Sequence, residues 1–206
     1  MANAEKVGNA DVLVEASDVC VHFGSIVALA PTSFRLTRGS AVALVGSNGS
    51  GKTTLLRLLA GLARPTRGEL DVGVDRSRLG YLAHEPLVYR ELTAIENLDL
   101  FGRLYRVPER RERIGMVLER FSLWDARHDR VSTYSRGMTQ RLALCRTLLH
   151  DPELIVLDEP YSALDESGAT LLDHELEALA AERTLVVSTH DPDRIALLAT
   201  TTVALG

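Results

Sequence analysis

One short segment of the 206-residue chain has the residue types and the spacing needed to hold phosphate groups. Gly46-Ser47-Asn48-Gly49-Ser50-Gly51-Lys52-Thr53 fits the pattern G-x-x-x-x-G-K-[ST] at every fixed position. The glycines let the backbone curl so that successive N–H groups converge on one phosphate. Lys52 supplies a positive charge for the β- and γ-phosphates of a nucleotide, and the Thr53 hydroxyl is placed to ligate Mg²⁺. The segment therefore predicts a site for a nucleotide and its metal ion.

The sequence on either side of this phosphate loop (residues 46–53) predicts the elements that its chemistry requires. Residues 40–45 have the apolar character of a short buried strand. Residues 54–61, beginning with Thr54, have the pattern of a helix that a glycine stops. The start of that helix, near Gly51, would add its positive end to the phosphate site. The alternative is a glycine-rich turn followed by a chance Lys-Thr, and the flanking pattern argues against it.

Polar residues that suit catalysis follow two apolar segments later in the chain. Asp158 and Glu159 come after residues 154–157, and His190 comes after residues 184–188. Ligands bind beyond the carboxyl ends of the strands in open α/β sheets, so we expect all three near the phosphates. Asp158 would hold Mg²⁺ through water, and Glu159 would orient and polarise an attacking water. The alternatives are a solvated acidic pair and a structural histidine.

The elements that must position these residues alternate between strand and helix patterns. We expect strands at residues 12–21, 34–36, 40–45, 69–72, 79–82, 154–157, 184–188 and 201–205, and helices at residues 166–183 and 193–199. Residues 93–148 differ, because their apolar spacing is helical with breaks near Pro108 and at residues 125–133. The alternation predicts a parallel sheet with crossover helices, and the helical stretch predicts an insertion into it.

Composition and charge limit the functions that the chain can have. A hydrophobic content of 46% and a charged content of 25% are typical of a globular protein, and 206 residues can bury a full core. The net charge of −5 argues against a general nucleic-acid binder, so we expect no nucleic-acid partner. Cys20 and Cys145 are far apart and outside any CxxC pattern, which favours two core residues over a metal site or a redox pair.

The N-terminal residues 1–11 are too polar for a signal peptide, and we expect them to be disordered. No apolar run approaches the length of a transmembrane helix. We therefore expect a cytoplasmic protein that reaches the cytoplasmic face of the cell membrane only through a partner.

In their order along the chain, these motifs resemble those of the ATP-binding cassette (ABC) ATPases. The set comprises the phosphate loop, Tyr134-Ser135-Arg136-Gly137-Met138, Asp158-Glu159, Ser162-Ala163-Leu164-Asp165 and His190. The likeness runs from about Val12 to the end of the chain. It implies an α/β P-loop NTPase core with a mainly parallel sheet and an antiparallel β subdomain. It also implies a helical subdomain at about residues 86–150, inserted in a single domain of residues 12–206.

The resemblance assigns further roles in binding ATP and Mg²⁺. Phe23 falls where the family places an aromatic ring that stacks on adenine. His190 matches the switch histidine that contacts the γ-phosphate. Ser135 and Gly137 fall in the signature motif, which reaches across a homodimer, formed on ATP binding, to the nucleotide of the other subunit. Asp165 matches the loop through which the two subunits sense each other.

The chain departs from the family pattern in two places. The usual signature is Leu-Ser-Gly-Gly-Gln, whereas this chain has Tyr134, Arg136 and Met138 at the first, third and fifth positions. The serine and the second glycine of the motif remain available for contact with a nucleotide. His84 takes the place of the glutamine that usually links the core to the helical subdomain. Because imidazole can accept or donate a hydrogen bond, we expect His84 near the metal, with a surface loop residue as the alternative.

The resemblance implies the ATP-hydrolysing subunit of an ABC membrane transporter, which drives export through a separate transmembrane permease subunit. The small size and the segment 158–165 resemble the ATP-binding subunit of the haem exporter in cytochrome c maturation, and short subunits of other exporters look similar. Residues 85–98 are expected to form the groove that docks the membrane subunit.

Two other functions are the alternatives. The first is a soluble ABC-type ATPase in DNA repair or on the ribosome, which usually has a long coiled-coil insertion or two cassettes. The second is a nucleotide-binding protein without turnover, against which the intact Lys52, Asp158, Glu159 and His190 argue.

Overall fold

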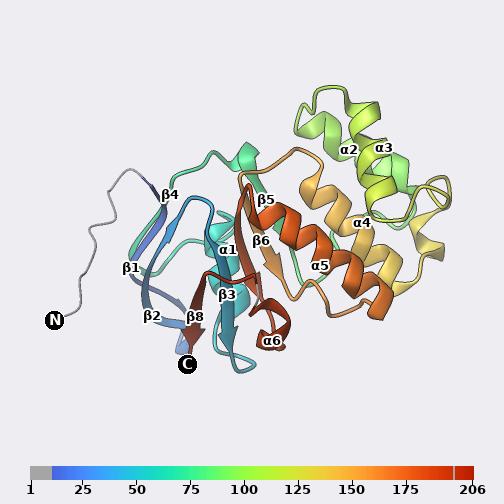
Figure 1. Ribbon diagram of the computed structural model, residues 1–206. Coiled ribbons are helices and arrows are strands. Elements are labelled where there is room, and N and C mark those ends of the chain that lie inside the picture. Colours follow the sequence, from blue (N-terminus) through green and yellow to red (C-terminus); the bar gives the residue numbers. More distant parts are fainter. Residues whose placement is uncertain (1–10, 197) are drawn as a thin grey trace.

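The computed structural model describes residues 11–196 and 198–206, which form two β-sheets with helices packed around them (Figure 1). Residues 1–11 are predicted to be disordered, and residues 1–10 of that segment lie outside the described residues. No helix in the described part of the chain combines the length and the apolar character that crossing a membrane requires. Both cysteines are free and buried, which confirms their prediction as core residues.

The larger sheet contains five parallel strands in the order β5-β6-β7-β3-β8. Its members are β3 (Ala41–Gly46), β5 (Leu79–Leu82), β6 (Leu154–Asp158), β7 (Thr184–Ser188) and β8 (Thr201–Leu205). Because the strands are parallel, the carboxyl ends of β3, β6 and β7 meet at one edge of the sheet. The phosphate loop, Glu159 and His190 follow these three ends, so the topology alone gathers them.

The smaller sheet contains three antiparallel strands in the order β2-β1-β4. Its members are β1 (Val12–Phe23), β2 (Ile26–Thr37) and β4 (Arg67–Val72). β2 is much longer than the predicted strand at residues 34–36, because Pro31 interrupts the sequence pattern without ending the strand. Proline is tolerated there because β2 lies at the edge of the sheet. The parallel core and the antiparallel sheet confirm the predicted fold class.

Helices connect the strands. They are α1 (Lys52–Leu59), α2 (Ala94–Leu104), α3 (Arg110–Arg120), α4 (Arg136–Leu148), α5 (Glu166–Ala180) and α6 (Pro192–Ile195), with 3₁₀ turns at Arg76–Arg78 and Val131–Thr133. The predicted helix ends at residues 183 and 199 are wrong. α5 ends at Ala180, and the amides of Glu182 and Arg183 both donate to the carbonyl oxygen of Leu179 in a closing turn before β7 begins. α6 begins with Pro192, which is suited to a first helical turn, and ends at Ile195.

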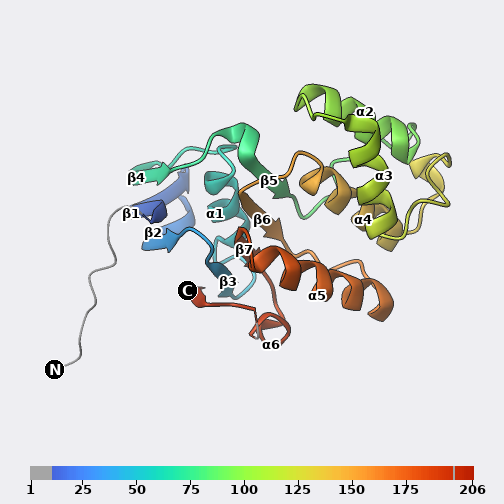
Figure 2. The ribbon, with the colours of Figure 1, turned by 45° about the horizontal axis from the view of Figure 1, so that its top comes forward.

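Helices lie on both faces of the parallel sheet (Figure 2), and an apolar layer packs against each face. Ile155 and Leu157 of β6 face a core that includes α4, α5 and the helices α2 and α3. Leu154 and Val156 of the same strand face α1 and the antiparallel sheet. This alternation follows from the two-residue period of a strand and explains why β6 is apolar throughout. Burial on both faces makes β6 a rigid base for the carboxylates at its end.

The helices α2, α3 and α4 pack on one another at the side of the sheet that carries β5 (Figure 1). α2 begins with a capping box in which Thr93 Oγ1 accepts from the Glu96 amide at 3.2 Å and Glu96 Oε2 accepts from the Thr93 amide at 2.8 Å. Phe121 and Leu142 join this helical region to the core. The three helices fall within residues 86–150, and the boundaries of an inserted subdomain within residues 12–206 stay a prediction.

Candidate functional site

The phosphate loop leaves the buried strand β3 and enters α1 directly. Gly51 is the N-cap of α1 and adopts φ of +99°, a left-handed conformation that favours glycine. The Lys52 side chain is buried, and its Nζ donates to the carbonyl oxygens of Gly46 at 2.7 Å and Ser47 at 3.2 Å. The loop thus curls around the ammonium group of Lys52. This arrangement places a positive charge and the N-terminus of a helix at the same point.

A cleft of about 440 Å³ opens beside this loop and collects most of the predicted site residues. Its lining consists of Ile26, Val27, Ala28, Asn48, Gly49, Gly51, Lys52, Thr53, Thr54, His84, Asp158, Glu159 and His190. The loop, the two carboxylates and both histidines therefore face one space, as the order of the strands predicts. The side chains of β2 residues 26–28 form an apolar wall that sequence reasoning did not assign to the site.

Asp158 is held in place by a serine on the neighbouring strand. The register of the sheet sets Asp158 of β6 opposite Ser188 of β7. Ser188 Oγ donates to Asp158 Oδ1 at 2.7 Å and accepts from the Glu159 amide at 3.0 Å. One hydroxyl thus fixes both acidic residues. Sequence reasoning missed Ser188, although a polar residue at the end of an apolar strand was a visible signal.

Glu159 and His190 form the second contact of the site. Glu159 Oε1 lies 2.8 Å from His190 Nδ1, and Glu159 is 8% exposed. Burial raises the pKa of Glu159, while the charges of His190 and Lys52 act in the opposite direction. The Glu159 backbone has φ of +50°, a conformation uncommon for residues other than glycine. Such strain is often found at functional sites, so the position of Glu159 favours a chemical role.

The residues of the cleft fit a divalent cation that arrives with phosphate groups. Asp158 Oδ2 is buried and has no hydrogen-bond partner among the residues that the structure describes, which leaves it available as a ligand. In the same part of the chain, no group of three or more His, Cys, Asp and Glu side chains could hold a metal by itself. Mg²⁺ typically takes one or two protein ligands and completes its shell with phosphates and water. Asp158 and Thr53, which both line the cleft, suit that role.

Apart from three residues of the phosphate loop itself (Gly46, Ser47 and Ser50), four predicted site residues lie outside the cleft lining. Phe23, at the end of β1, is 67% exposed. Ser135 is the N-cap of α4, where its hydroxyl accepts from the Met138 amide at 3.1 Å. Asp165 is the N-cap of α5 and accepts from the Gly168 amide at 2.8 Å, a bond that lowers the Asp165 pKa. Gly137 is the fourth. A single chain therefore does not bring these residues to the phosphate loop.

The signature segment and the segment after Glu159 are nevertheless in contact. A Cβ atom added to Gly137 would lie 3.3 Å from the carbonyl oxygen of Ala163. Gln140 of α4 is buried, and its Nε2 donates to the carbonyl oxygen of Pro160 at 3.1 Å. Sequence reasoning missed Gln140, since its helical pattern carried no sign of this partner. The signature segment and the segment that follows Glu159 thus pack against each other.

Replacing Gly51 with alanine is expected to disrupt the phosphate loop. The new Cβ would lie 2.7 Å from the carbonyl oxygen of Ala28, and φ of +99° costs any other residue about 1–2 kcal/mol. We expect nucleotide affinity to fall by at least roughly tenfold, measured by calorimetric titration with ATP, since 1.4 kcal/mol is a factor of ten. Gly39→Ala is the matched control, because Gly39 has φ of +73° with no atom near its Cβ. Equal affinities in the two variants would contradict the prediction.

Comparison with known proteins agrees with this geometry. The family model described as "ABC transporter" matches residues 29–162. An uncharacterized ABC transporter ATP-binding protein of Bacillus subtilis, YxlF, is 39% identical over 86% of this chain and 62% of its own length. The ABC transporter ATP-binding protein NatA of the same organism is 35% identical over 84% of this chain and 76% of its own length. The chain thus spans less than two thirds of the first relative.

Solved structures have the same fold. The structure of an ATP-binding subunit of an ABC transporter superposes with a TM-score of 0.85 at 28% identity, over 94% of this chain and 85% of the other. A dimeric post-hydrolysis ATP-binding cassette bound to ADP and Pi superposes with a TM-score of 0.84 at 28% identity, over 93% and 94%. The chain therefore belongs to the ABC transporter family and carries its ATP-binding ATPase fold.

Proposed function

We propose that the chain is the ATP-hydrolysing subunit of an ABC membrane transporter that exports its substrate through a separate permease. The observation that carries this proposal is the cleft, where the phosphate loop faces Asp158, Glu159, His190 and His84. A phosphate loop alone suits any nucleotide-binding protein. The addition of a buried carboxylate in contact with a histidine, beyond the ends of adjacent strands, suits hydrolysis of a γ-phosphate.

In this proposal each cleft residue has a defined task. Lys52 Nζ leaves the carbonyl oxygens of the loop to contact the β- and γ-phosphates. Glu159 accepts a hydrogen bond from the attacking water and orients it, and His190 contacts the γ-phosphate while its Nδ1 stays on Glu159. Thr53 and Asp158 would hold Mg²⁺, with His84 next to it. When bound, the ion neutralises charge on the phosphates.

The four predicted site residues that lie outside both the phosphate loop and the cleft lining support a dimer in which each site is shared. Ser135 and Asp165 are exposed, and Gly137 lies on the same surface next to Ala163. In our proposal this surface of one copy faces the phosphate loop of a second copy when ATP is bound. Phe23 would stack on adenine at the rim of the same site. The likeness to a dimeric cassette supports this arrangement.

We propose that a membrane partner docks on a groove between α1, β5 and α4, next to the helical region. Several large apolar side chains are exposed there: Leu62, Leu87, Tyr89, Leu104 and Tyr105. Leu62, Leu87 and Tyr105 line a groove with Tyr81 and Arg146 between α1, β5 and α4. Exposed apolar patches of this kind mark surfaces that bind another protein. The groove includes Leu87, which falls within residues 85–98, and its occupation would place the chain on the cytoplasmic face of the membrane.

Relatives support export, without defining a substrate. One is the daunorubicin resistance ATP-binding protein DrrA3 of Streptomyces coeruleorubidus, 36% identical over 87% of this chain. Another is the bacitracin transport ATP-binding protein BcrA of Bacillus licheniformis, 32% identical over 86%. Neither name mentions haem, so haem export for cytochrome c maturation stays a prediction without support from these relatives. The alternative of a soluble ATPase in DNA repair or on the ribosome has no support from their names either.

Membrane recovery tests the proposed docking. Leu87→Asp is expected to remove the chain from purified membranes and from a cross-linked permease, because it replaces an exposed apolar contact of the groove with a charge. Membrane-bound protein would be measured by immunoblot, and the permease identified by mass spectrometry. ATP hydrolysis by the purified variant should stay within about twofold of the wild type, since Leu87 lies outside the cleft.

Met116→Asp is the matched control, since Met116 is 59% exposed on α3 and lies outside that groove. Equal loss or equal retention in both variants would exclude the groove as the docking site. Recovery of the wild-type chain with ribosomes or DNA, and not with membranes, would favour the soluble alternative.

A further inference from the structure

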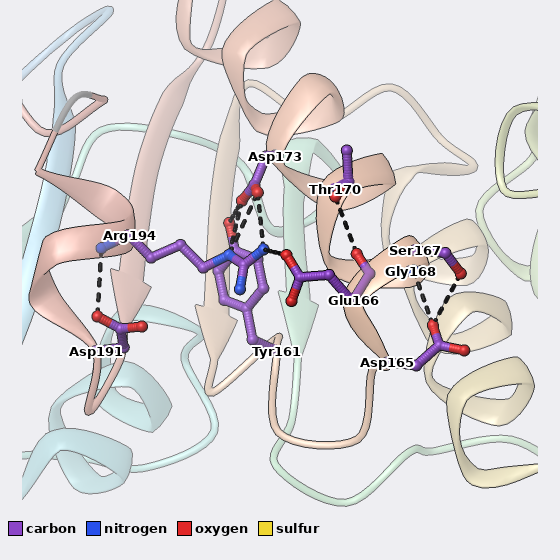
Figure 3. A network of polar contacts seen from close by, with 9 residues as sticks. All are labelled: Tyr161, Asp165, Glu166, Ser167, Gly168, Thr170, Asp173, Asp191 and Arg194. Carbon is purple, nitrogen blue, oxygen red and sulfur yellow. Dashed lines mark hydrogen bonds and ion pairs between the residues drawn. The ribbon is translucent and has the colours of Figure 1, made fainter.

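A polar network outside the cleft joins the segments that follow β6 and β7 (Figure 3). Arg194 of α6 donates to Asp173 of α5, from Nη2 to Oδ2 at 3.0 Å and from Nε to Oδ1 at 3.2 Å. Tyr161 Oη donates to the same Asp173 Oδ1 at 2.7 Å. The Arg194 guanidinium also lies 5.0 Å from the centre of the Tyr161 ring. We call these three residues, Tyr161, Asp173 and Arg194, the clamp.

The position of the clamp in the chain relates it to both catalytic residues. Tyr161 comes two residues after Glu159, and Arg194 comes four residues after His190. Asp173 lies on α5, which packs on β7. The clamp therefore ties the chain that leaves β6 to the chain that leaves β7, using one carboxylate as the common acceptor. The same two segments meet inside the cleft, where Glu159 and His190 are 2.8 Å apart.

The chemistry of the clamp suits precise positioning. Arg194 presents two donors to one carboxylate, a planar geometry that fixes orientation as well as distance. The side chains of Arg194 and Asp173 are 25% and 31% exposed, so the pair is better shielded than an ordinary surface ion pair. Asp173 raises the pKa of Arg194 through their hydrogen bond. Burial raises the pKa of Tyr161, and the hydrogen bond to Asp173 raises it further. Tyr161 therefore stays protonated and Arg194 stays charged across the working range of pH.

Neighbouring acidic groups make Arg194 the central cation of this surface. Glu166 Oε1 lies 3.6 Å from Arg194 Nη2, and Asp191 Oδ1 accepts from the Arg194 amide at 3.4 Å. Asp165, at the N-terminus of α5, is satisfied separately by Ser167 and Gly168 (Figure 3). Losing the Arg194 side chain would leave Asp173 and Glu166 without their shared counter-charge.

We propose that the clamp positions Glu159 and His190 for ATP hydrolysis by holding the two segments in register. Its members contact neither the nucleotide nor the attacking water; they act through the Glu159–His190 contact. The proposal rests on the proposed function as an ATPase. It predicts that the clamp affects the chemical step far more than it affects ATP binding, because a small misplacement of a catalytic group is costly in rate.

Steady-state kinetics of the full chain test the clamp. Asp173→Asn keeps the shape of the side chain and removes its charge. We expect kcat to fall roughly tenfold, with KM for ATP within about twofold of the wild type. Glu177→Gln is the matched control, since Glu177 lies one turn further along α5, is exposed, and loses the same charge. Arg194→Lys, which keeps the charge without the planar fork, should give an intermediate rate.

Two further readouts separate positioning from general stability. In a Glu159→Gln background, Asp173→Asn should lower the remaining rate by less than about twofold, because the clamp acts through Glu159. Amide hydrogen exchange by mass spectrometry should show faster exchange in peptides covering residues 159–165 and 189–196 of Asp173→Asn. Exchange in β6 and β7 should be unchanged, since those strands are buried independently of the clamp.

Defined outcomes would overturn the proposal. They are a kcat within twofold of the wild type, an equal loss in Glu177→Gln, or an undiminished tenfold effect in the Glu159→Gln background. If Asp173→Asn does not fold, Tyr161→Phe, which removes one hydroxyl, takes its place with an expected fall of roughly threefold. If the wild type itself does not hydrolyse ATP, the proposed function fails. The exchange measurement then still decides whether the clamp holds the two segments.

Discussion

Replacing Glu159 with glutamine is expected to slow ATP hydrolysis by roughly two orders of magnitude or more, while ATP still binds. The glutamine side chain has nearly the same shape as that of glutamate, so the contacts of residue 159 with His190 and Ser188 are preserved. It cannot polarise the attacking water as a carboxylate does. Phosphate release would be measured at saturating ATP, and affinity by titration with the nucleotide. Wild-type rates in Glu159→Gln would remove this residue from the mechanism.

Two controls make this result specific to Glu159. Asp158→Asn should instead weaken the Mg²⁺-dependent part of ATP binding, because it removes the free carboxylate oxygen. The pH profile of kcat is the second control. Burial raises the pKa of Glu159, so a proton is retained to a higher pH than for an ordinary glutamate. The wild-type rate should therefore fall on the acid side at a pH above the ordinary pKa of 4.5. Glu159→Gln should lack this decline.

Mixing two inactive variants is expected to restore ATP hydrolysis. Lys52→Ala removes the charge of the phosphate loop, and Ser135→Arg puts bulk and positive charge at the exposed N-cap of α4. Each variant alone should form dimers with two defective sites. In a mixed dimer one site carries both changes, and the other joins an intact loop to an intact signature. Phosphate release would be measured for each variant and for an equimolar mixture after subunit exchange.

The size of the recovery follows from counting dimers. Random exchange makes about half of all dimers mixed, and each mixed dimer has one intact site of two. If one intact site is sufficient for turnover, the mixture should reach about one quarter of the wild-type rate, from parents that are at least roughly a hundredfold slower. Ser132→Arg, mixed with Lys52→Ala in the same way, is the matched control for Ser135→Arg. It adds the same side chain at an exposed residue just before the signature. Cross-linked mixed dimers with no gain in rate would mean that each site is closed within one chain.

The sequence predicted those parts of the site that depend on local pattern. The phosphate loop, the strand before it and the acidic pair after β6 were predictable because each requires particular residues at fixed spacing. The parallel sheet then brought them into one cleft, since its strands end at the same edge. The roles predicted for Phe23, Ser135, Gly137 and Asp165 stay predictions, because one chain does not place them at the loop.

Features that depend on tertiary pairing escaped prediction. Ser188 supports Asp158 because β6 and β7 are adjacent, although they are separated by α5 along the chain. The clamp needs α6 to lie beside α5, which no pattern in either short segment indicates. β2 was underestimated because Pro31 breaks its alternation, and edge position alone makes that residue acceptable. Local pattern identifies chemical groups, whereas the supports of those groups come from the assembled fold.

The place of β3 in the sheet has a consequence for how the protein is made. β3 is synthesised early. Both strands that pair with it come much later in the chain, β7 at residues 184–188 and β8 at residues 201–205. On the ribosome, a nascent chain that stops before β7 holds β3 with both edges unpaired, a state prone to association with other chains. The phosphate loop has no fixed base during that period. We therefore expect ATP to bind only after β7 and β8 have been synthesised, and to stabilise the folded protein by mass action from then on.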